Sequence, residues 1–210
     1  MGIKKIIDKV KEEVKVLKGE ESKDRVYQNE QNYPDVASAR GAFEESKKKL
    51  FNVNLWSKLE GINSTFELHD DSGRKTTSEV PEVGYYVKVT LPGAEVENWV
   101  QVNDIKTTRD LAEFTVQPSH KPNPPAKEEK VTEHFFTSDA TSTFRVEVQG
   151  TKLIGSEIGR NEYINNKGEE SGDRSMLNTL IAEGGWAGFQ GLQWDKLTSY
   201  LVHLEEAKAE

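Results

Sequence analysis

The chain has 210 residues, a formal net charge of -8 and a mean hydropathy of -0.73. That length suits one domain with an accessory arm. An acidic surface argues against binding to a nucleic-acid backbone, because phosphates are recognised by a basic face. The chain contains no cysteine, which excludes disulfides, thiolate nucleophiles and cysteine-ligated zinc.

Membrane insertion and export are not expected from the sequence. No stretch approaches the roughly 20 apolar residues of a transmembrane helix. Charges interrupt residues 3–17 at every second or third position, so this segment does not resemble a signal peptide. We therefore expect a cytoplasmic location.

Residues 1–18 are predicted to form an amphipathic helix, with apolar residues at spacings of four and three and lysines on the opposite face. Three interpretations stay open. The helix docks on the protein's own surface, pairs with a second copy or another partner, or lies on an anionic membrane. Residues 20–32 are interpreted as a linker or a loosely held strand. A single α+β domain is expected over residues 33–210.

A second helix is predicted to begin after Pro34, with Asp35 as its N-cap. Its buried stripe is expected to contain Val36, Ala39, Phe43 and Leu50. Residues 51–59 are apolar enough to belong to the core as a last short helical turn, which Gly61 ends.

From residue 62 to residue 164 the hydrophobic period changes from about 3.6 to 2, which predicts six or seven antiparallel strands joined by hairpins. The alternation implies that one face of the sheet is buried and the other is exposed to solvent. The prolines of residues 119–130 make that segment a loop. A turn is expected at Gly150. The expected strands cover residues 65–68, 83–91, 99–105, 111–116, 131–136, 144–148 and 152–158.

The C-terminal region returns to a helical period, with a short helix over 176–181 and a longer one over 189–207. The longer helix is expected to pack on the apolar face of the sheet. Between them, residues 184–194 contain four glycines and three large aromatic residues. This segment is interpreted either as a plug at the end of the core or as an aromatic-lined entrance to a pocket between sheet and helix.

No motif for a nucleotide phosphate, a metal or a catalytic nucleophile is present, so no cofactor or metal site is predicted. His69 and the two aspartates after it are explained by turn chemistry. His134 lies either in a ligand cavity or on the sheet surface. The candidate ligand-binding residues are His134, Tyr85, Trp186, Phe189 and Trp194.

The order of these elements is two helices, a run of antiparallel strands and a long C-terminal helix. In this order alone, the chain resembles the helix-grip folds of START and Bet v 1 proteins. The resemblance implies a cavity between sheet and last helix that takes apolar ligands. Cystatin-like and NTF2-like folds, which differ in strand count and helix placement, are the alternatives.

Three functions are compatible with the sequence. The first is a non-catalytic module that binds an apolar small molecule between the sheet and the C-terminal helix. The second is an interaction or assembly protein, homo-oligomeric or bound to a partner through residues 1–18. The third and least favoured is an enzyme that uses His134 with an acidic partner.

Overall fold

The computed structural model describes residues 24–62, 64–91, 97–123, 134–165 and 187–207, with the side chains of the last range described from residue 191. The helices expected over 1–18 and 176–181 lie outside these ranges. Residues 184–186, the first part of the glycine- and aromatic-rich segment 184–194, also lie outside these ranges.

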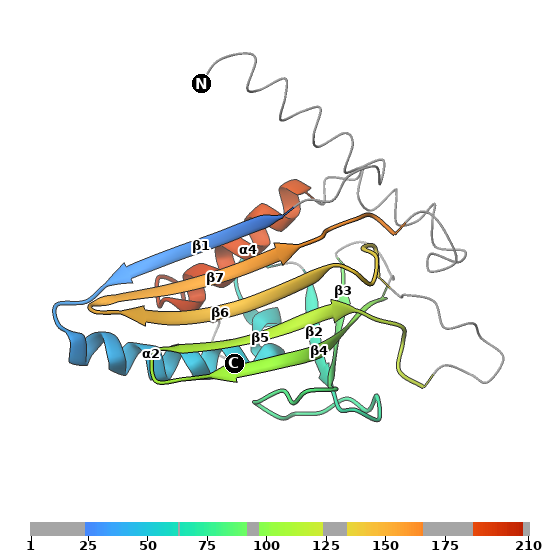
Figure 1. The fold of residues 1–210 in the computed structure, drawn as a ribbon, viewed down its shortest axis with the longest axis horizontal. Coiled ribbons are helices and arrows are strands. Elements are labelled where there is room, and N and C mark those ends of the chain that lie inside the picture. Colours follow the sequence, from blue (N-terminus) through green and yellow to red (C-terminus); the bar gives the residue numbers. More distant parts are fainter. Residues whose placement is uncertain (1–23, 63, 92–96, 124–133, 166–186, 208–210) are drawn as a thin grey trace, which may run out of the picture.

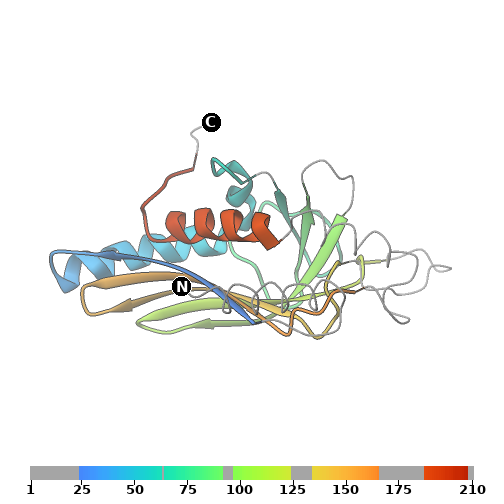
Figure 2. The ribbon, with the colours of Figure 1, turned by 90° about the horizontal axis from the view of Figure 1, so that it is seen from above.

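In the described ranges, seven antiparallel strands form one sheet in the spatial order β1-β7-β6-β5-β4-β3-β2 (Figure 1). Helix α2 (Val36–Phe51), the 3-10 helix η1 (Val53–Lys58) and helix α4 (Ala187–Leu201) all lie on one side of this sheet (Figure 2). The strands are β1 (Arg25–Asn32), β2 (Thr65–His69), β3 (Tyr86–Thr90), β4 (Glu97–Thr107), β5 (Leu111–Pro118), β6 (Thr141–Gln149) and β7 (Lys152–Arg160).

The predicted α+β class is confirmed, and the arrangement is helix-grip-like. Among the described elements, one strand precedes α2 and η1, six strands follow them, and α4 then crosses the sheet. The first strand pairs with the last, which places the two ends of the strand sequence side by side. This strand count and helix placement differ from those of the cystatin-like and NTF2-like alternatives.

Of the two interpretations of residues 20–32, a linker or a strand, the strand holds over Arg25–Asn32, which form β1. It pairs with β7 along its whole length, from Arg25 opposite Gly159 to Asn32 opposite Lys152. Its sequence contains few apolar residues. Of its inward side chains, Asn29 bonds polar groups of α4, where its Nδ2 donates to Thr198 Oγ1 at 2.9 Å. Whether the remainder of residues 1–32 forms a separate arm stays a prediction.

The expected strand over 131–136 is wrong for its described part, residues 134–136. Within the described ranges these residues join no ladder, and Phe136 makes an isolated bridge to Ile164. The backbone N–H of Phe136 donates to Nδ1 of His134 at 3.0 Å, so a side chain takes the hydrogen bond that a ladder would need.

Helix α2 begins as predicted, since Asp35 Oδ1 accepts a hydrogen bond from the backbone N–H of Ser38 at 2.8 Å. Ala39, Phe43 and Leu50 are buried as expected, whereas Val36 is exposed in the first turn. Within the described ranges, no helix combines the length and the hydropathy that a bilayer crossing requires.

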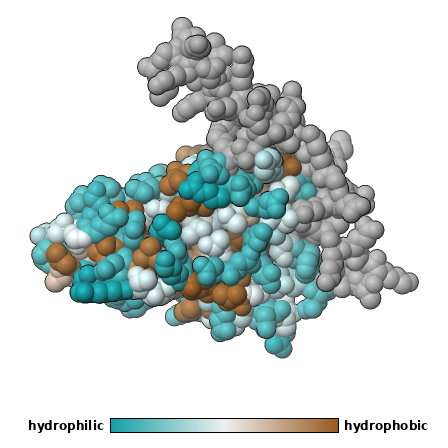
Figure 3. Space-filling model, viewed as in Figure 1, coloured by the Kyte–Doolittle hydropathy of each residue, from teal (hydrophilic) through white to brown (hydrophobic). Residues whose placement is uncertain are grey.

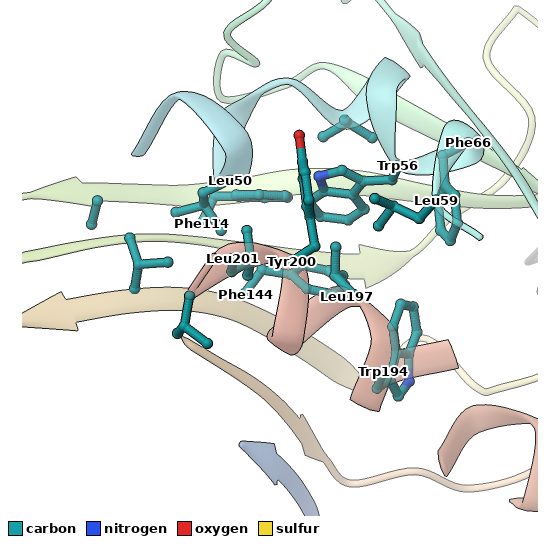
Figure 4. Close-up of a cluster of buried hydrophobic side chains, with 14 of the residues drawn as sticks. Leu50, Trp56, Leu59, Phe66, Phe114, Phe144, Trp194, Leu197, Tyr200 and Leu201 are labelled. Atoms are coloured by element: carbon teal, nitrogen blue, oxygen red, sulfur yellow. The ribbon is translucent and has the colours of Figure 1, made fainter. Parts of the chain in front are cut away.

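The core lies between the helices and the inner face of the sheet (Figure 4). Its centre is an aromatic cluster of Trp56, Phe66, Phe114, Phe144 and Trp194, with ring centroids 4.9 to 6.3 Å apart. The opposite face of the molecule, seen from the sheet side in Figure 3, is mostly hydrophilic with scattered hydrophobic residues. The predicted division into a buried and a solvent-facing side of the sheet is therefore confirmed.

Candidate ligand-binding cavity

A cavity of about 60 Å³ lies between the inner face of the sheet and the first half of α4. Its wall is mostly apolar, because strands β2 to β6 and η1 direct their core-facing side chains into it. The lining residues are Trp56, Phe66, Val87, Val89, Val100, Phe114, Val116, His134, Phe135, Phe136, Ser142, Phe144, Gln193 and Trp194.

Two neighbouring residues of α4 place unpaired polar atoms in this apolar wall. Gln193 is 1% exposed, and neither its Nε2 nor its Oε1 makes a hydrogen bond with a described residue. The indole Nε1 of Trp194 also lacks an acceptor among the described residues. An unpaired buried polar group costs about 1–3 kcal/mol, so most such groups in native structures have a partner. The cavity wall therefore presents one acceptor, Oε1 of Gln193, and two donor groups, the amide of Gln193 and the indole N–H of Trp194, that the described residues leave unpaired.

His134 is a buried member of the cavity wall, 8% exposed. Its Nδ1 accepts the hydrogen bond from Phe136, which leaves the hydrogen of the neutral ring on Nε2. Its ring stacks on Phe135 at a centroid distance of 4.3 Å, and its carbonyl accepts from Asn165 Nδ2 at 3.2 Å. The backbone around His134 is thus held by its own side chain and by Asn165.

An acidic cluster lies beside the cavity on the same face of the sheet. Glu157 is 1% exposed and Glu162 is 2% exposed. Arg25 Nε lies 3.6 Å from Oε2 of Glu162. A Cβ on Gly159 would lie 2.5 Å from Oε1 of Glu162, so a larger residue there would require this carboxylate to shift. The cluster therefore holds two buried carboxyl groups and one guanidinium.

Burial raises the pKa of Glu157 well above its ordinary value, and the neighbouring Glu162 adds to the rise. The Ser142 hydroxyl and the Arg25 guanidinium act in the opposite direction, because both favour the charged form. The hydroxyl lies near the carboxyl, but neither Glu157 oxygen makes a hydrogen bond of normal geometry with a residue in the described ranges.

No protein-family model and no curated protein matches this sequence. Solved structures do match. A hypothetical protein of Helicobacter pylori aligns with a TM-score of 0.51 and 9% identity, over 89% of this chain and 92% of that one.

Norcoclaurine synthase of Thalictrum flavum aligns with a TM-score of 0.41 and 14% identity, over 90% of this chain and 92% of that one. The major latex-like protein 151 of Panax ginseng aligns with a TM-score of 0.38 and 13% identity, over 76% of this chain and 95% of that one. The alignment with the Helicobacter pylori protein shows a likeness of fold alone.

The structure brings two of the five candidate site residues together in the cavity wall, His134 and Trp194. Tyr85 lies before β3 and is not among the residues that line the cavity. Trp186 lies outside the described residues, and Phe189 belongs to α4 without a described side chain. A contact between any of the five and a ligand stays a prediction.

Sequence reasoning missed the polar residues of the cavity wall, Gln193 and Ser142, and the buried Glu157 beside it. One signal was present for Gln193, since it is a long polar residue beside Trp194 in an otherwise apolar helix face. No comparable signal exists for Glu157. Apolar and polar residues alternate along β7, and this alternation predicts that the charged Glu157 lies on the outer face of the sheet.

Replacing Glu157 with glutamine is expected to flatten the dependence of stability on pH. A carboxyl group whose pKa is raised in the folded state keeps its proton while the unfolded chain has already lost it. Stability therefore falls as pH rises above the ordinary carboxyl pKa, by about 1.4 kcal/mol for each pH unit up to the folded pKa.

The measurement is the free energy of unfolding by urea from about pH 5 to about pH 8, where the wild type should lose stability and E157Q should lose less. The control is E113Q, since Glu113 is a largely buried carboxyl group paired with Arg145 instead. Parallel pH curves for the wild type and E157Q would contradict this prediction.

Proposed function

We propose that the protein binds a small, mostly apolar molecule that carries a hydrogen-bonding group. The observation that carries this proposal is Gln193, a buried amide in the wall of an apolar cavity with no partner among the described residues. A ligand in the cavity would supply the missing partner for Gln193, and for the Trp194 indole as well. Apolar walls with a few convergent polar groups are typical of small-molecule sites.

The size of the cavity limits the ligand. An engineered cavity of about 150 Å³ admits benzene, whereas this one measures about 60 Å³. It therefore suits a short or branched alkyl group of a few carbons. An aromatic ring or a long lipid chain would require the wall to move.

The other hypotheses stay predictions. Assembly through residues 1–18 concerns a part of the chain outside the described ranges, and the cytoplasmic location is an expectation from the sequence. An enzyme that uses His134 with an acidic partner is supported less well, since His134 Nδ1 is occupied by the backbone of Phe136.

Xenon is a suitable first probe, because it binds in apolar cavities without any hydrogen bond. In a titration followed by NMR, xenon should shift the signals of cavity-lining valine methyl groups and saturate. Shifts that do not saturate, or that arise away from the cavity, would contradict the proposal.

Two matched variants sharpen this test. Val116 lines the cavity and Val146 lies in the core away from it, and both are buried. The extra methylene of V116L enters open space, so xenon should bind several-fold more weakly with little loss of stability. The extra methylene of V146L meets packed side chains, so it should cost about 1–3 kcal/mol of stability and leave xenon binding unchanged.

A further inference from the structure

The Glu157 carboxyl lies on the inner face of the sheet, next to the cavity wall. In the antiparallel register Glu157 is opposite Phe144 on one side and Tyr27 on the other. Directly opposed residues share a face of the sheet, and Phe144 lines the cavity. Ser142, two residues before Phe144, lines it too. Glu157 therefore stands immediately behind the part of the wall that these two residues form.

Helix α4 covers this position from above. A Cβ on Gly191 would lie 3.8 Å from the ring of Tyr27, the strand partner of Glu157. Further along the helix, Thr198 and Leu201 lie over Gly155. Glu157 is thus level with the turn of α4 that begins at Gly191 and carries Gln193. This turn lies beyond the first turn of the helix, where the dipole would favour an anion.

Neither protonation state satisfies Glu157 within the described residues. As a carboxylate it has two buried oxygens without a hydrogen-bond donor in normal geometry. As a carboxylic acid it would add a buried O–H beside the Ser142 hydroxyl, with which it makes no hydrogen bond of normal geometry. Both forms are costly. A group that donates a hydrogen bond and carries a positive charge would satisfy the carboxylate.

The charges around Glu157 select the sign of such a group. Glu162 and Arg25 lie close to each other, so the guanidinium is shared with a second carboxylate. Because burial raises the pKa of Glu157, a cation at this end of the cavity would favour its charged form, whereas an anionic ligand would be repelled by that form and by Glu162.

We propose that the polar end of the cavity receives a basic nitrogen, so that the ligand is a small alkyl amine. The inference rests on the proposed function, because it requires a ligand in the cavity. An ammonium group has three N–H donors. The cavity wall carries two acceptors, the Ser142 hydroxyl and Oε1 of Gln193, and the Glu157 carboxyl lies behind Ser142 and Phe144. The alkyl group lies against the aromatic wall of Trp56 and Phe144.

The test compares propylamine, 1-propanol and propionate, which share an alkyl chain and differ in charge. NMR titrations of the full chain near neutral pH follow the indole N–H of Trp194 and the side-chain amide of Gln193. We expect propylamine to bind about tenfold more tightly than 1-propanol, as a hydrogen bond to a charged group allows. Propionate should bind more weakly than either.

Two variants assign this preference to Glu157. In E157Q, propylamine should bind no more tightly than 1-propanol, while xenon binding stays as in the wild type. In E113Q, which removes the carboxylate paired with Arg145, the preference for the amine should be unchanged. Even if E157Q fails to fold, the order of affinities of the three probes for the wild type tests the preference for an amine.

The outcomes separate the two proposals. If xenon and 1-propanol bind but propylamine binds no more tightly, the amine inference is overturned and the proposed function stands. If neither xenon nor 1-propanol binds, the proposed function fails. A preference for propylamine that persists in E157Q would overturn the role of Glu157.

Discussion

Replacing Trp56 with alanine is expected to lower the free energy of unfolding by about 3–5 kcal/mol. Trp56 is 1% exposed and is the largest fully buried side chain of the described residues. Its ring lies 4.9 Å from Phe144, 5.6 Å from Phe66 and 5.9 Å from Phe114, measured between centroids. Figure 4 shows it in the centre of the core, between η1 and α4. Truncation therefore removes contacts on every side.

The same substitution changes the cavity, because Trp56 forms part of its wall. The space left by the indole ring should join the existing cavity of about 60 Å³, which makes room for an aromatic molecule. Added indole is therefore expected to bind the W56A variant and to recover part of its lost stability. In the wild type, indole should have no such effect.

Urea unfolding followed by circular dichroism measures the loss, and thermal unfolding with and without indole measures the recovery. The control is W56F, which keeps a ring but loses the hydrogen bond from Nε1 to the carbonyl of Lys49 at 3.1 Å. It should cost about 1–2 kcal/mol. A loss below about 1 kcal/mol in W56A would mean that the core refills the space.

Replacing Gly155 with leucine is expected to cost about 3 kcal/mol or more, because α4 would have to move away from the sheet. A Cβ on Gly155 would lie 3.1 Å from Leu201 Cβ, from the carbonyl oxygen of Thr198 and from Val202 Cγ1. The Thr198 oxygen belongs to the helix backbone and cannot rotate aside. Alanine at this position should cost about 1–2 kcal/mol, since only the Cβ must be accommodated.

The matched control is Gly41, which lies in α2, where a Cβ would have no neighbouring atom within 4 Å. G41A should raise stability by about 0.5–1 kcal/mol, because alanine favours the helix over glycine. Urea unfolding of G155A, G155L and G41A measures all three changes. Equal stability of G155L and the wild type would show that α4 does not need this close approach.

Local signals in the sequence were sufficient for the elements whose determinants lie within a few residues. Asp35 caps α2 as its position after Pro34 predicts, and Gly150 takes a positive φ of 63° in the turn between β6 and β7. The alternation of Phe144, Val146 and Val148 with charged residues predicted β6 and its buried face. These features depend on backbone preference and on side-chain period, which neighbouring residues express on their own.

Strand β1 and the segment around His134 were harder, since distant residues complete their hydrogen bonds. The inward residues of β1 include Asn29, whose partners Asp195 and Thr198 come more than 160 residues later. The apolar residues after His134 suggest a strand, but the His134 ring takes the backbone N–H of Phe136. The order of apolar and polar residues along the chain does not show which group each of these hydrogen bonds will reach.

The sequence by itself determined the α+β class, a sheet with one buried face, a covering C-terminal helix and the aromatic residues that can fill its core. Only the tertiary structure decided that β1 closes the sheet against β7, that His134 and Trp194 share a cavity wall and that Glu157 lies behind it. The physical reason is that burial and pairing of a polar group depend on residues from other strands and helices. Glu157 becomes a buried carboxyl without a donor only when Phe144, Tyr27 and α4 come together around it.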